Sequence, residues 1–244
     1  MSKLNNNFYN KPIIYIFCIF DCMKKIFFSI IILFTFSITG QKLTKGFVYL
    51  SNIAPSIKIE LRYISNNNFI GKPIDGYNRN CIILSSKAAK AIRKIQQELL
   101  KKGYSLKIFD AYRPQQAVNN FVRWAKVLSD TLMKKQYYPD VPKSELFNQG
   151  YIASKSSHSR GSTLDLTIIN SKTKTELDMG SSYDFFGIQS HPYYKKISEK
   201  QKENRMLLRK IMLSNGFKPY ENEWWHFTLK KEPFPKTYFN FPIN

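Results

Sequence analysis

The sequence has 244 residues, with 38 Lys and Arg against 17 Asp and Glu and a formal net charge of +21 at pH 7. Such a charge suits nucleic acid or an anionic surface, but the lysines are scattered and no basic run alternates with aromatic residues as in a known nucleic-acid-binding module. We therefore expect no nucleic-acid partner and a solvated basic surface, with salt-sensitive attraction to an anionic cell envelope as a weaker role.

Residues 1–40 have the character of a leader. Met23 and two lysines precede an apolar run that closes with small residues at Gly40, the order of a secretory signal peptide. The run is too short to span a bilayer comfortably. We expect a misassigned start over 1–22, a signal peptide over 23–40 cleaved near Gly40, and an exported protein, periplasmic or secreted, without a stable membrane span. The alternative is an uncleaved anchor that also uses Lys11 to Phe20.

Removal of the leader leaves about 200 residues, enough for one domain with a sizeable core. We expect the domain to occupy 41–230 and a tail rich in Pro and Phe to occupy 231–244. Cys18 and Cys22 leave with the leader, so Cys81 is the one remaining thiol and no internal disulfide can form. Cys81 lies in an apolar stretch and is interpreted as a small buried residue.

Helices and short strands mix along this domain without repeats. A helix is expected to begin at Ser85-Ser86 and to close with a glycine cap at Gly103, followed by a strand from Tyr104 to Phe109. Pro114 suits the first turn of a second helix, whose apolar stripe runs from Ala117 to Leu128.

A long polar connection from Lys134 to Ser157 leads to a predicted strand from Thr163 to Ile169. A third helix begins at Ser198, where Gln201 completes a capping-box pattern, and a last strand covers Trp225 to Leu229. These elements predict a single α+β domain with a small central antiparallel sheet flanked by helices.

Two of the three histidines stand in segments that together suit one zinc site. The first segment offers His158 and Asp165, and the second offers Glu223 and His226. A catalytic zinc usually takes three protein ligands and keeps a fourth position for water, so the two histidines and Asp165 make a set. Glu223 is then placed to act as the base for that water. For either segment alone, an ordinary surface or hydrogen-bonded core histidine is as good an interpretation as a metal ligand. Only the two segments together indicate a metal site.

Strand geometry constrains this site. Asp165 faces away from the apolar side of its strand, and His158 must come from the loop before it, which Gly161 allows to turn sharply. Residues three apart on a regular strand point to opposite faces, so Glu223 and His226 would not share a metal. We therefore expect Glu223 at an irregular start of the last strand and the site at the mouth of the sheet. The two tryptophans between them are interpreted as packing residues.

Further segments accompany the two metal segments in a fixed order. They are Leu61-Arg62-Tyr63 with Asn68-Phe69-Ile70-Gly71, Phe109 to Gln115, and Asp178-Met179-Gly180 leading to Tyr183-Asp184-Phe185-Phe186. With these, the chain from roughly Gly46 to Leu229 resembles the D-alanyl-D-alanine dipeptidases of the VanX type. Those zinc peptidases are related to D,D-carboxypeptidases and to the hedgehog amino-terminal domain.

The resemblance implies the zinc ligands and the base named above, and it adds three roles. Arg113 matches the arginine that steadies the developing oxyanion, and Asp184 matches the acid that holds the substrate's ammonium group. Ser156 stands two residues before the first ligand, where it would help to position the substrate. Without the resemblance, Arg113 could be a surface residue at a helix start, and Asp184 a turn residue or the partner of a nearby lysine.

Two positions depart from the family pattern. Thr163 stands where alanine is common, and we expect its extra hydroxyl and methyl groups to change the size of the pocket. The chain after Asp184 is less acidic than usual before Ser190-His191. We expect His191 to lie near the active site without binding the metal.

The implied reaction is hydrolysis of D-alanyl-D-alanine to two D-alanines, with one zinc ion per chain and a small dipeptide as the partner. A D,D-carboxypeptidase acting on peptidoglycan stem peptides would need a more open cleft, and Asp184 favours the dipeptidase. A non-catalytic, zinc-stabilised cell-envelope binding protein would not need Glu223 and Arg113. The sequence leaves open the oligomeric state, the strictness for D-alanine, and a role in antibiotic resistance, wall recycling or nutrition.

Overall fold

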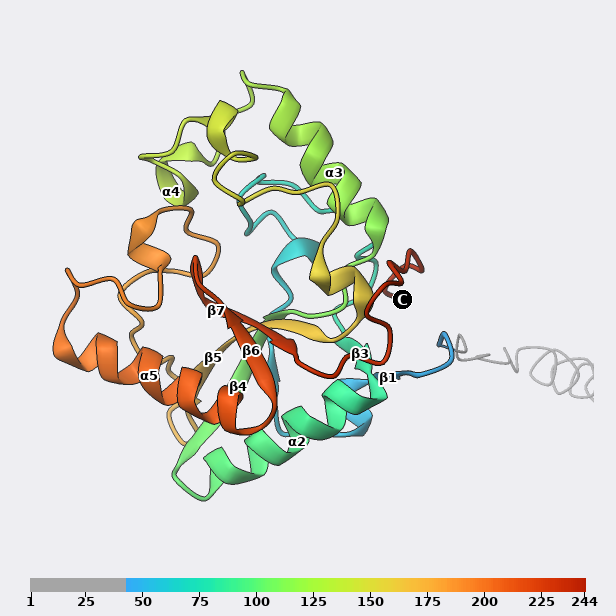
Figure 1. The fold of residues 1–244 in the computed structure, drawn as a ribbon, viewed down its shortest axis with the longest axis vertical. Coiled ribbons are helices and arrows are strands. Elements are labelled where there is room, and N and C mark those ends of the chain that lie inside the picture. The colour runs from blue at the N-terminus through green and yellow to red at the C-terminus, as the bar shows by residue number, and fades with distance from the viewer. Residues whose placement is uncertain (1–42) are drawn as a thin grey trace, which may run out of the picture. The chain divides into compact units, whose positions relative to one another are not determined.

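A five-stranded mixed sheet lies at the centre of the fold (Figure 1). The computed structural model describes residues 43–244, and the strand order is β2-β4-β5-β7-β6. The strands are β2 (Lys58–Ile59), β4 (Tyr104–Asp110), β5 (Thr163–Asn170), β6 (Phe217–Tyr220) and β7 (Glu223–Leu229). β2 runs parallel to β4, and the other neighbours are antiparallel. The α+β prediction is confirmed, and the expected antiparallel sheet gains one parallel edge strand that is too short to leave an alternating pattern.

The predictions about the leader, namely the signal peptide, the start at Met23 and the cleavage near Gly40, lie outside the described residues, as do Cys18 and Cys22. Within residues 43–244, no helix is both long and apolar enough to cross a membrane. Cys81 belongs to this part and is a free, half-buried thiol, not the fully buried residue expected. Its Sγ lies 3.8 Å from the carbonyl oxygen of Asn244.

α2 (Ser86–Leu100) confirms the first predicted helix, and it packs against β4. Ser85 caps its start, because the Ser85 hydroxyl oxygen accepts a hydrogen bond from the backbone N–H of Ala88 at 3.3 Å. The chain leaves the helix through Gly103, whose φ of +78° favours glycine. The side of the helix that faces the sheet is fully buried and consists of Ala88, Ala89, Ile92, Ile95 and Leu99.

α3 (Gln115–Lys126) begins directly after Pro114, whose φ of −62° suits a helix entry. The helix ends at Lys126, and Leu128 is 57% exposed. The predicted apolar stripe is therefore correct as far as Ala125 and wrong at Leu128. Neither glycine nor proline marks the helix end in the sequence, which is why the pattern was extended too far.

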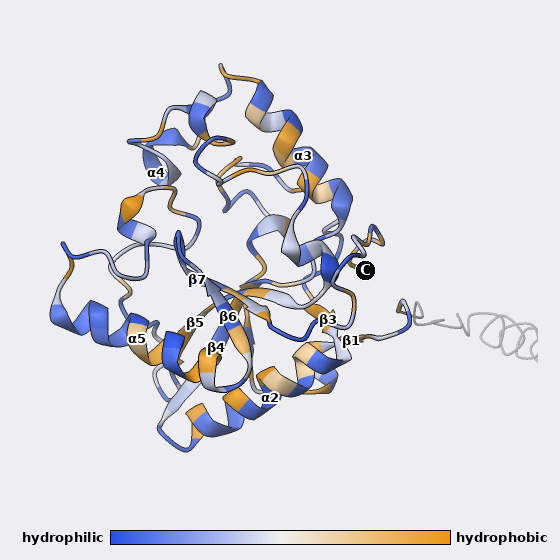
Figure 2. Ribbon diagram, viewed as in Figure 1, coloured by the Kyte–Doolittle hydropathy of each residue, from blue (hydrophilic) through white to orange (hydrophobic). Residues whose placement is uncertain are grey.

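α5 (Glu199–Ser214) packs against β6 and β7. The capping box is confirmed, since the backbone N–H of Gln201 donates to the Ser198 hydroxyl at 3.3 Å and the backbone N–H of Ser198 donates to Gln201 Oε1 at 2.8 Å. Figure 2 shows hydrophobic residues gathered on the central strands, while much of α5 is hydrophilic. The helix therefore covers the sheet with one side and faces solvent with the other.

The predicted polar connection before Ser157 is packed against the core, although it is rich in polar residues. It contains α4 (Lys134–Tyr137), and its buried side chains include Tyr137, Tyr138, Leu146 and Ile152. Short 3-10 helices join the larger elements: η1 (Leu50–Asn52), η2 (Arg62–Ile64), η3 (Lys143–Glu145), η4 (Ser157–Arg160) and η5 (Ile188–Ser190).

The tail, residues 231–244, packs beside a second, two-stranded antiparallel sheet of β1 (Phe47–Tyr49) and β3 (Ile83–Ser85). The ring of Phe47 contacts the rings of Phe234, Phe239 and Phe241, with centroids 4.9 to 5.6 Å apart. The backbone N–H of Phe239 also donates to the carbonyl of Ser159 at 2.9 Å. The tail thereby braces η4, the turn that carries His158.

Candidate active site

Three elements bring His158, Asp165 and His226 together. Asp165 on β5 and His226 on β7 are directly opposed in the antiparallel pair, so their side chains leave the sheet on the same face. His158 comes from η4, which ends at Gly161 with a φ of +77°. A methyl group at that glycine would lie 2.1 Å from a carbon of the Phe47 ring, so the turn is also tightly packed. The sequence prediction that these three residues converge is confirmed.

The three facing atoms form a nearly equilateral triangle. Asp165 Oδ1 lies 3.1 Å from His226 Nδ1 and 3.4 Å from His158 Nε2, and the two nitrogens are 3.3 Å apart. Ligands about 2.0–2.2 Å from a tetrahedral ion lie about 3.3–3.6 Å from one another. Asp165 Oδ1 is buried, and apart from the two imidazoles it has no hydrogen-bond partner. The residues therefore fit a metal ion bound by two imidazoles and a carboxylate.

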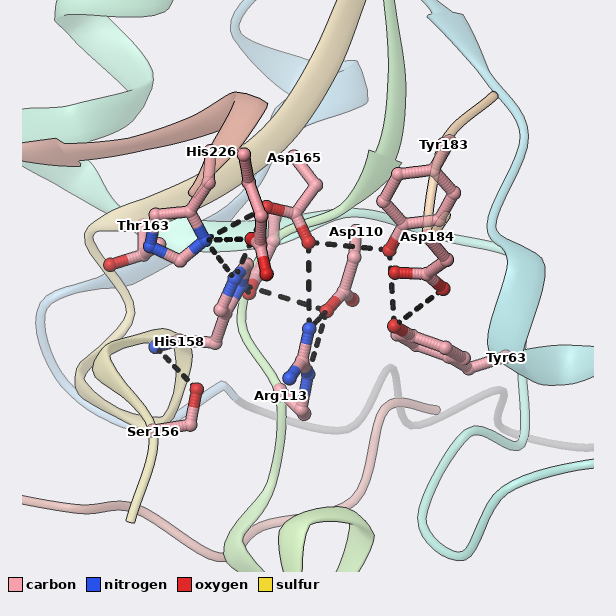
Figure 3. Close-up of polar contacts among 12 residues, drawn as sticks. Tyr63, Asp110, Arg113, Ser156, His158, Thr163, Asp165, Tyr183, Asp184 and His226 are labelled. Carbon is pink, nitrogen blue, oxygen red and sulfur yellow. Dashed lines mark hydrogen bonds and ion pairs between the residues drawn. The ribbon is translucent and has the colours of Figure 1, made fainter. Parts of the chain in front are cut away.

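Other contacts hold these side chains in place (Figure 3). His158 Nδ1 lies 2.7 Å from the carbonyl of Ala111, which fixes the proton on that nitrogen and leaves Nε2 free to bind a metal. The second oxygen of Asp165, Oδ2, accepts a hydrogen bond from the Tyr183 hydroxyl at 3.2 Å and lies 3.5 Å from Arg113 Nη2. Each oxygen of Asp165 thus has a separate environment, and only Oδ1 faces the histidines.

The electrostatics of the triad keep Asp165 ionised. Burial raises the pKa of its carboxyl, but the charges and hydrogen bonds of His158 and His226 outweigh burial and leave the pKa well below its ordinary value. Burial also lowers the pKa of His158, which favours the neutral imidazole that a metal needs.

Glu223 stands at the start of β7, where the strand is irregular. Tyr220 pairs with Glu223, but Pro219 pairs with Phe227, so the register shifts at the intervening residues. As a result, Glu223 Oε2 comes within 3.5 Å of His226 Nδ1, and the expected irregular mouth is confirmed. Burial raises the pKa of Glu223 to about 7, since it outweighs the lowering effect of His226. Such a pKa suits a general base near neutral pH.

Arg113 is held at the site by a residue to which the sequence assigned no role. Asp110 is fully buried, and its Oδ2 accepts a hydrogen bond from Arg113 Nε at 2.9 Å and forms an ion pair with Nη2 at 2.8 Å. The hydroxyl of Tyr77 donates to the other oxygen at 2.7 Å. The guanidinium also lies over the rings of Tyr63 and Phe121, 5.2 and 5.1 Å from their centroids. In the sequence, only the three-residue spacing between Asp110 and Arg113 could have indicated this ion pair.

Asp184 lies deep in the same cavity, and only 5% of the residue is exposed. Its Oδ2 accepts a hydrogen bond from the Tyr63 hydroxyl at 2.9 Å. Burial raises the pKa of Asp184 well above its ordinary value, and the nearby charge of Asp165 raises it further. A cation entering the cavity would offset both effects and restore the carboxylate.

The cavity has a volume of about 230 Å³. Its polar lining brings together the predicted site residues, namely Arg113, Ser156, His158, Asp165, Asp184, Glu223 and His226. Phe69, Phe121, Tyr151 and Phe186 supply much of the apolar lining. Ser156 caps η4, because its hydroxyl oxygen accepts from the backbone N–H of His158 at 3.3 Å. In Figure 3, Ser156 lies beside His158, whereas Asp184 lies away from it, between Tyr183 and Tyr63.

Thr163, the departure from the family pattern, does not line this cavity. Its hydroxyl exchanges a hydrogen bond with that of Thr228 at 2.9 Å, across the β5–β7 pair, and both residues are buried. The expected effect of Thr163 on pocket size is therefore wrong, since its side chain is used within the sheet.

The tryptophans and His191 do not line the cavity. Trp224 and Trp225 are both buried, which confirms them as packing residues, and Trp225 contacts the ring of Tyr183 at 5.5 Å between centroids. The carbonyl of His191 accepts a hydrogen bond from Arg205 Nη1 at 2.7 Å, and its side chain lines a separate surface hollow.

Sequence comparisons identify the family of this chain. The family model described as D-ala-D-ala dipeptidase matches residues 43–244. The chain belongs to this family. The match includes residues 231–244, so the similarity extends beyond Leu229, the limit taken from the motifs alone.

Three curated members of the family are similar over nearly their whole length, and each is named D-alanyl-D-alanine dipeptidase. The protein from Enterococcus faecalis is 45% identical over 82% of this chain and 98% of its own. The protein from Enterococcus faecium is 41% identical over 81% and 98%. The protein from Streptomyces coelicolor is 38% identical over 82% and 100%. Membership thus rests on the whole domain and not on the motifs alone.

Proposed function

We propose that this protein hydrolyses D-alanyl-D-alanine to two D-alanines, with one zinc ion bound by His158, Asp165 and His226. The observation that carries the proposal is the triangle of facing donor atoms, 3.1 to 3.4 Å apart, in a member of the D-Ala-D-Ala dipeptidase family. Two imidazole nitrogens and one carboxylate oxygen form a donor set typical of catalytic zinc. Bound there, zinc would polarise the peptide carbonyl and acidify water at the fourth position.

Glu223 and Arg113 would carry out the chemistry around that position. Glu223 lies next to His226, and its raised pKa allows it to take a proton from the attacking water and return it to the leaving amine. Arg113 is fixed by Asp110, so its cation is already in place when negative charge grows on the carbonyl oxygen. The presence of both groups in one cavity favours catalysis over a purely structural zinc site.

The cavity also has the charges that a free dipeptide needs. Asp184 would receive the ammonium group, and Tyr63 would hold the Asp184 carboxylate through its hydroxyl. Ser156 lies beside His158 and away from Asp184 (Figure 3). Lys155, its neighbour in the chain, also lines the cavity and could face the terminal carboxylate. A volume of about 230 Å³ is small beside drug-sized pockets of about 300–1,000 Å³. Size and charge both favour a small zwitterion.

Turnover of D-alanyl-D-alanine is the direct test. Release of D-alanine should be compared between the dipeptide and a stem pentapeptide that ends in D-Ala-D-Ala, with zinc content measured on the same sample. We expect one zinc per chain and a strong preference for the dipeptide. Equal cleavage of both would replace the proposal with a D,D-carboxypeptidase, and zinc without turnover would favour a non-catalytic binding protein.

We propose further that the protein is exported, on the evidence of the signal-like sequence over 23–40. Expression in the native host, followed by mass spectrometry of the mature amino terminus, tests this directly. A terminus near Gly40 is expected. A mature protein that begins upstream of Met23 would reject both the start and the cleavage site.

A further inference from the structure

Tyr183 and Asp184 are neighbours in the chain, yet both contact one hydroxyl group. The Tyr63 hydroxyl donates to Asp184 Oδ2 at 2.9 Å and lies 3.1 Å from the Tyr183 hydroxyl. In an extended segment, neighbouring side chains point to opposite faces. Asp184 has a φ of +60°, a left-handed conformation that non-glycine residues rarely adopt, and this turn brings both side chains into one site. The left-handed backbone at Asp184 therefore places the Tyr183 hydroxyl and the Asp184 carboxylate close together.

The Tyr183 hydroxyl also contacts the proposed metal site. It lies 3.2 Å from Asp165 Oδ2, the oxygen that faces away from the histidines. The ring is buried, stacks on Phe109 with centroids 4.5 Å apart, and meets the edge of Trp225 at 5.5 Å. These two ring contacts restrict the ring and therefore the position of its hydroxyl. Asp165 is thus held through Oδ2, while Oδ1 stays free for the metal.

We propose that Tyr183 is a positioning residue that holds Asp165 in its metal-binding orientation and, through Tyr63, links that ligand to the ammonium subsite at Asp184. The inference rests on the proposed dipeptidase function and deepens it. Neither tyrosine has to react, because both act through hydrogen bonds. The residues form a chain in the order Asp184, Tyr63, Tyr183, Asp165 (Figure 3).

The hydroxyl protons couple the links of this chain. It has three links, but each phenol has a single hydroxyl proton. While Tyr63 donates to Asp184, Tyr183 has one proton for two acceptors, the Tyr63 hydroxyl and Asp165 Oδ2. A change in the hydrogen bond between Tyr63 and Asp184 therefore changes how strongly Tyr183 holds Asp165, because hydrogen bonds in such a series strengthen one another.

The first test measures zinc affinity. Tyr183→Phe removes one hydroxyl and keeps the packed ring, and loss of such an outer contact typically weakens metal binding about tenfold to a hundredfold. We expect that loss in competition with a chromophoric chelator. Tyr138→Phe is the matched control, because the Tyr138 hydroxyl is buried and has no hydrogen-bond partner. Its zinc affinity should stay within about twofold of wild type.

The metal-free proteins separate positioning from a merely structural role. Thermal unfolding of the metal-free Tyr183→Phe variant should stay as cooperative as that of the metal-free wild type, with at most the small loss expected for the removal of one buried hydroxyl. A variant that binds zinc as tightly as wild type, or that fails to fold, would overturn the inference. Absence of zinc from the wild type would instead overturn the proposed function.

The second test addresses the link to Asp184. Tyr63→Phe, Tyr183→Phe and the double variant should be compared by kcat/KM for D-alanyl-D-alanine. If the two hydroxyls act as one chain, the first substitution already interrupts it and the second adds little. The kcat/KM of the double variant should then be at most about threefold lower than that of the less active single variant. If the fold losses in kcat/KM of the two single variants multiply in the double variant, the two tyrosines act independently. That result would overturn the proposed link between Asp165 and Asp184.

Discussion

Asp110 and Arg113 form a buried ion pair at the end of β4, in which one carboxylate oxygen lies 2.9 and 2.8 Å from two nitrogens of the guanidinium. Asp110 has no exposed surface, and its other oxygen is satisfied by Tyr77. These contacts hold the long, flexible side chain of Arg113 in one orientation before substrate binds. For a group that stabilises a transition state, this preorganisation matters more than the charge alone.

The first prediction is that Asp110→Asn slows turnover without removing the metal. A hydrogen bond to a charged group contributes about 1.5–3 kcal/mol, so kcat should fall about tenfold to a hundredfold while zinc content stays near one per chain. Asp75→Asn is the control, because Asp75 pairs with Arg123 on the exposed surface. An Asp110→Asn enzyme with unchanged kcat would show that Arg113 needs no anchor.

The second prediction concerns the metal ligands. His158→Ala, Asp165→Ala or His226→Ala should each lose both zinc and activity, because two remaining ligands hold the ion weakly. Glu223→Ala should keep zinc and lose most turnover, since the base is not a ligand. Metal analysis of the purified variants checks both statements. Full zinc occupancy in any of the first three would remove that residue from the site.

The third prediction is an acid limb in the pH profile that belongs to Glu223. The base must be ionised to accept a proton, so kcat/KM should rise as the pH increases through its pKa. Burial raises that pKa from an ordinary 4.5 to about 7, and a cation bound beside it would lower it, so the midpoint should lie between these values. If the residual activity of Glu223→Gln shows the same limb, another group is titrating.

The fourth prediction separates two glycines with almost the same backbone angle. Gly161 and Gly103 have φ values of +77° and +78°, but a methyl group at Gly161 would lie 2.1 Å from Phe47, whereas at Gly103 it would meet nothing within 4 Å. Gly103→Ala should therefore lose only the backbone cost of about 1–2 kcal/mol. Gly161→Ala should lose a further amount of about 1–3 kcal/mol from overpacking.

Urea denaturation of the two alanine variants checks this difference. Gly161→Ala should also lower zinc affinity, because the turn it disturbs carries His158. Equal stability losses in the two variants would mean that the Phe47 ring moves aside without cost.

The convergence of His158, Asp165 and His226 could be predicted from the sequence because local patterns place these residues. Asp165 lies on the polar side of an alternating strand, and His158 lies before a glycine that permits a sharp turn. Even the irregular position of Glu223 followed from its three-residue spacing to His226. Local sequence patterns therefore predict where a side chain points when a single strand or turn determines its direction.

The contacts that support the triad could not be predicted in this way. Tyr63, Asp110 and Tyr183 come from separate elements and meet only because β4 and β5 pair and the chain takes a left-handed turn at Asp184. Nothing in a local window indicates which polar atoms will meet in the core. For the same reason the sequence did not show that Thr163 bonds to Thr228 across the sheet instead of facing the cavity.

The last prediction concerns the free amino end of the substrate. If the Asp184 carboxylate pairs with the ammonium group of a dipeptide, acetylation removes the charge and adds bulk in a cavity of about 230 Å³. N-acetyl-D-Ala-D-Ala should then be hydrolysed about tenfold to a hundredfold more slowly, as expected for a lost charge-assisted hydrogen bond.

Asp184→Ala should erase much of this preference by slowing the free dipeptide most, whereas Asp140→Ala, at an exposed position, should leave it unchanged. The ratio of kcat/KM for the free and acetylated dipeptides, measured for wild type and both variants, tests this role of Asp184.

Proton release on binding tests the same contact. Because burial holds Asp184 towards its neutral form in the empty cavity, binding of the ammonium group must bring back the carboxylate. Binding should therefore release about one proton at a pH below the pKa of Asp184, detectable as a dependence of the calorimetric heat on the ionisation enthalpy of the buffer. Glu223→Ala provides the inactive protein for that measurement, and a heat independent of buffer would place the ammonium group elsewhere.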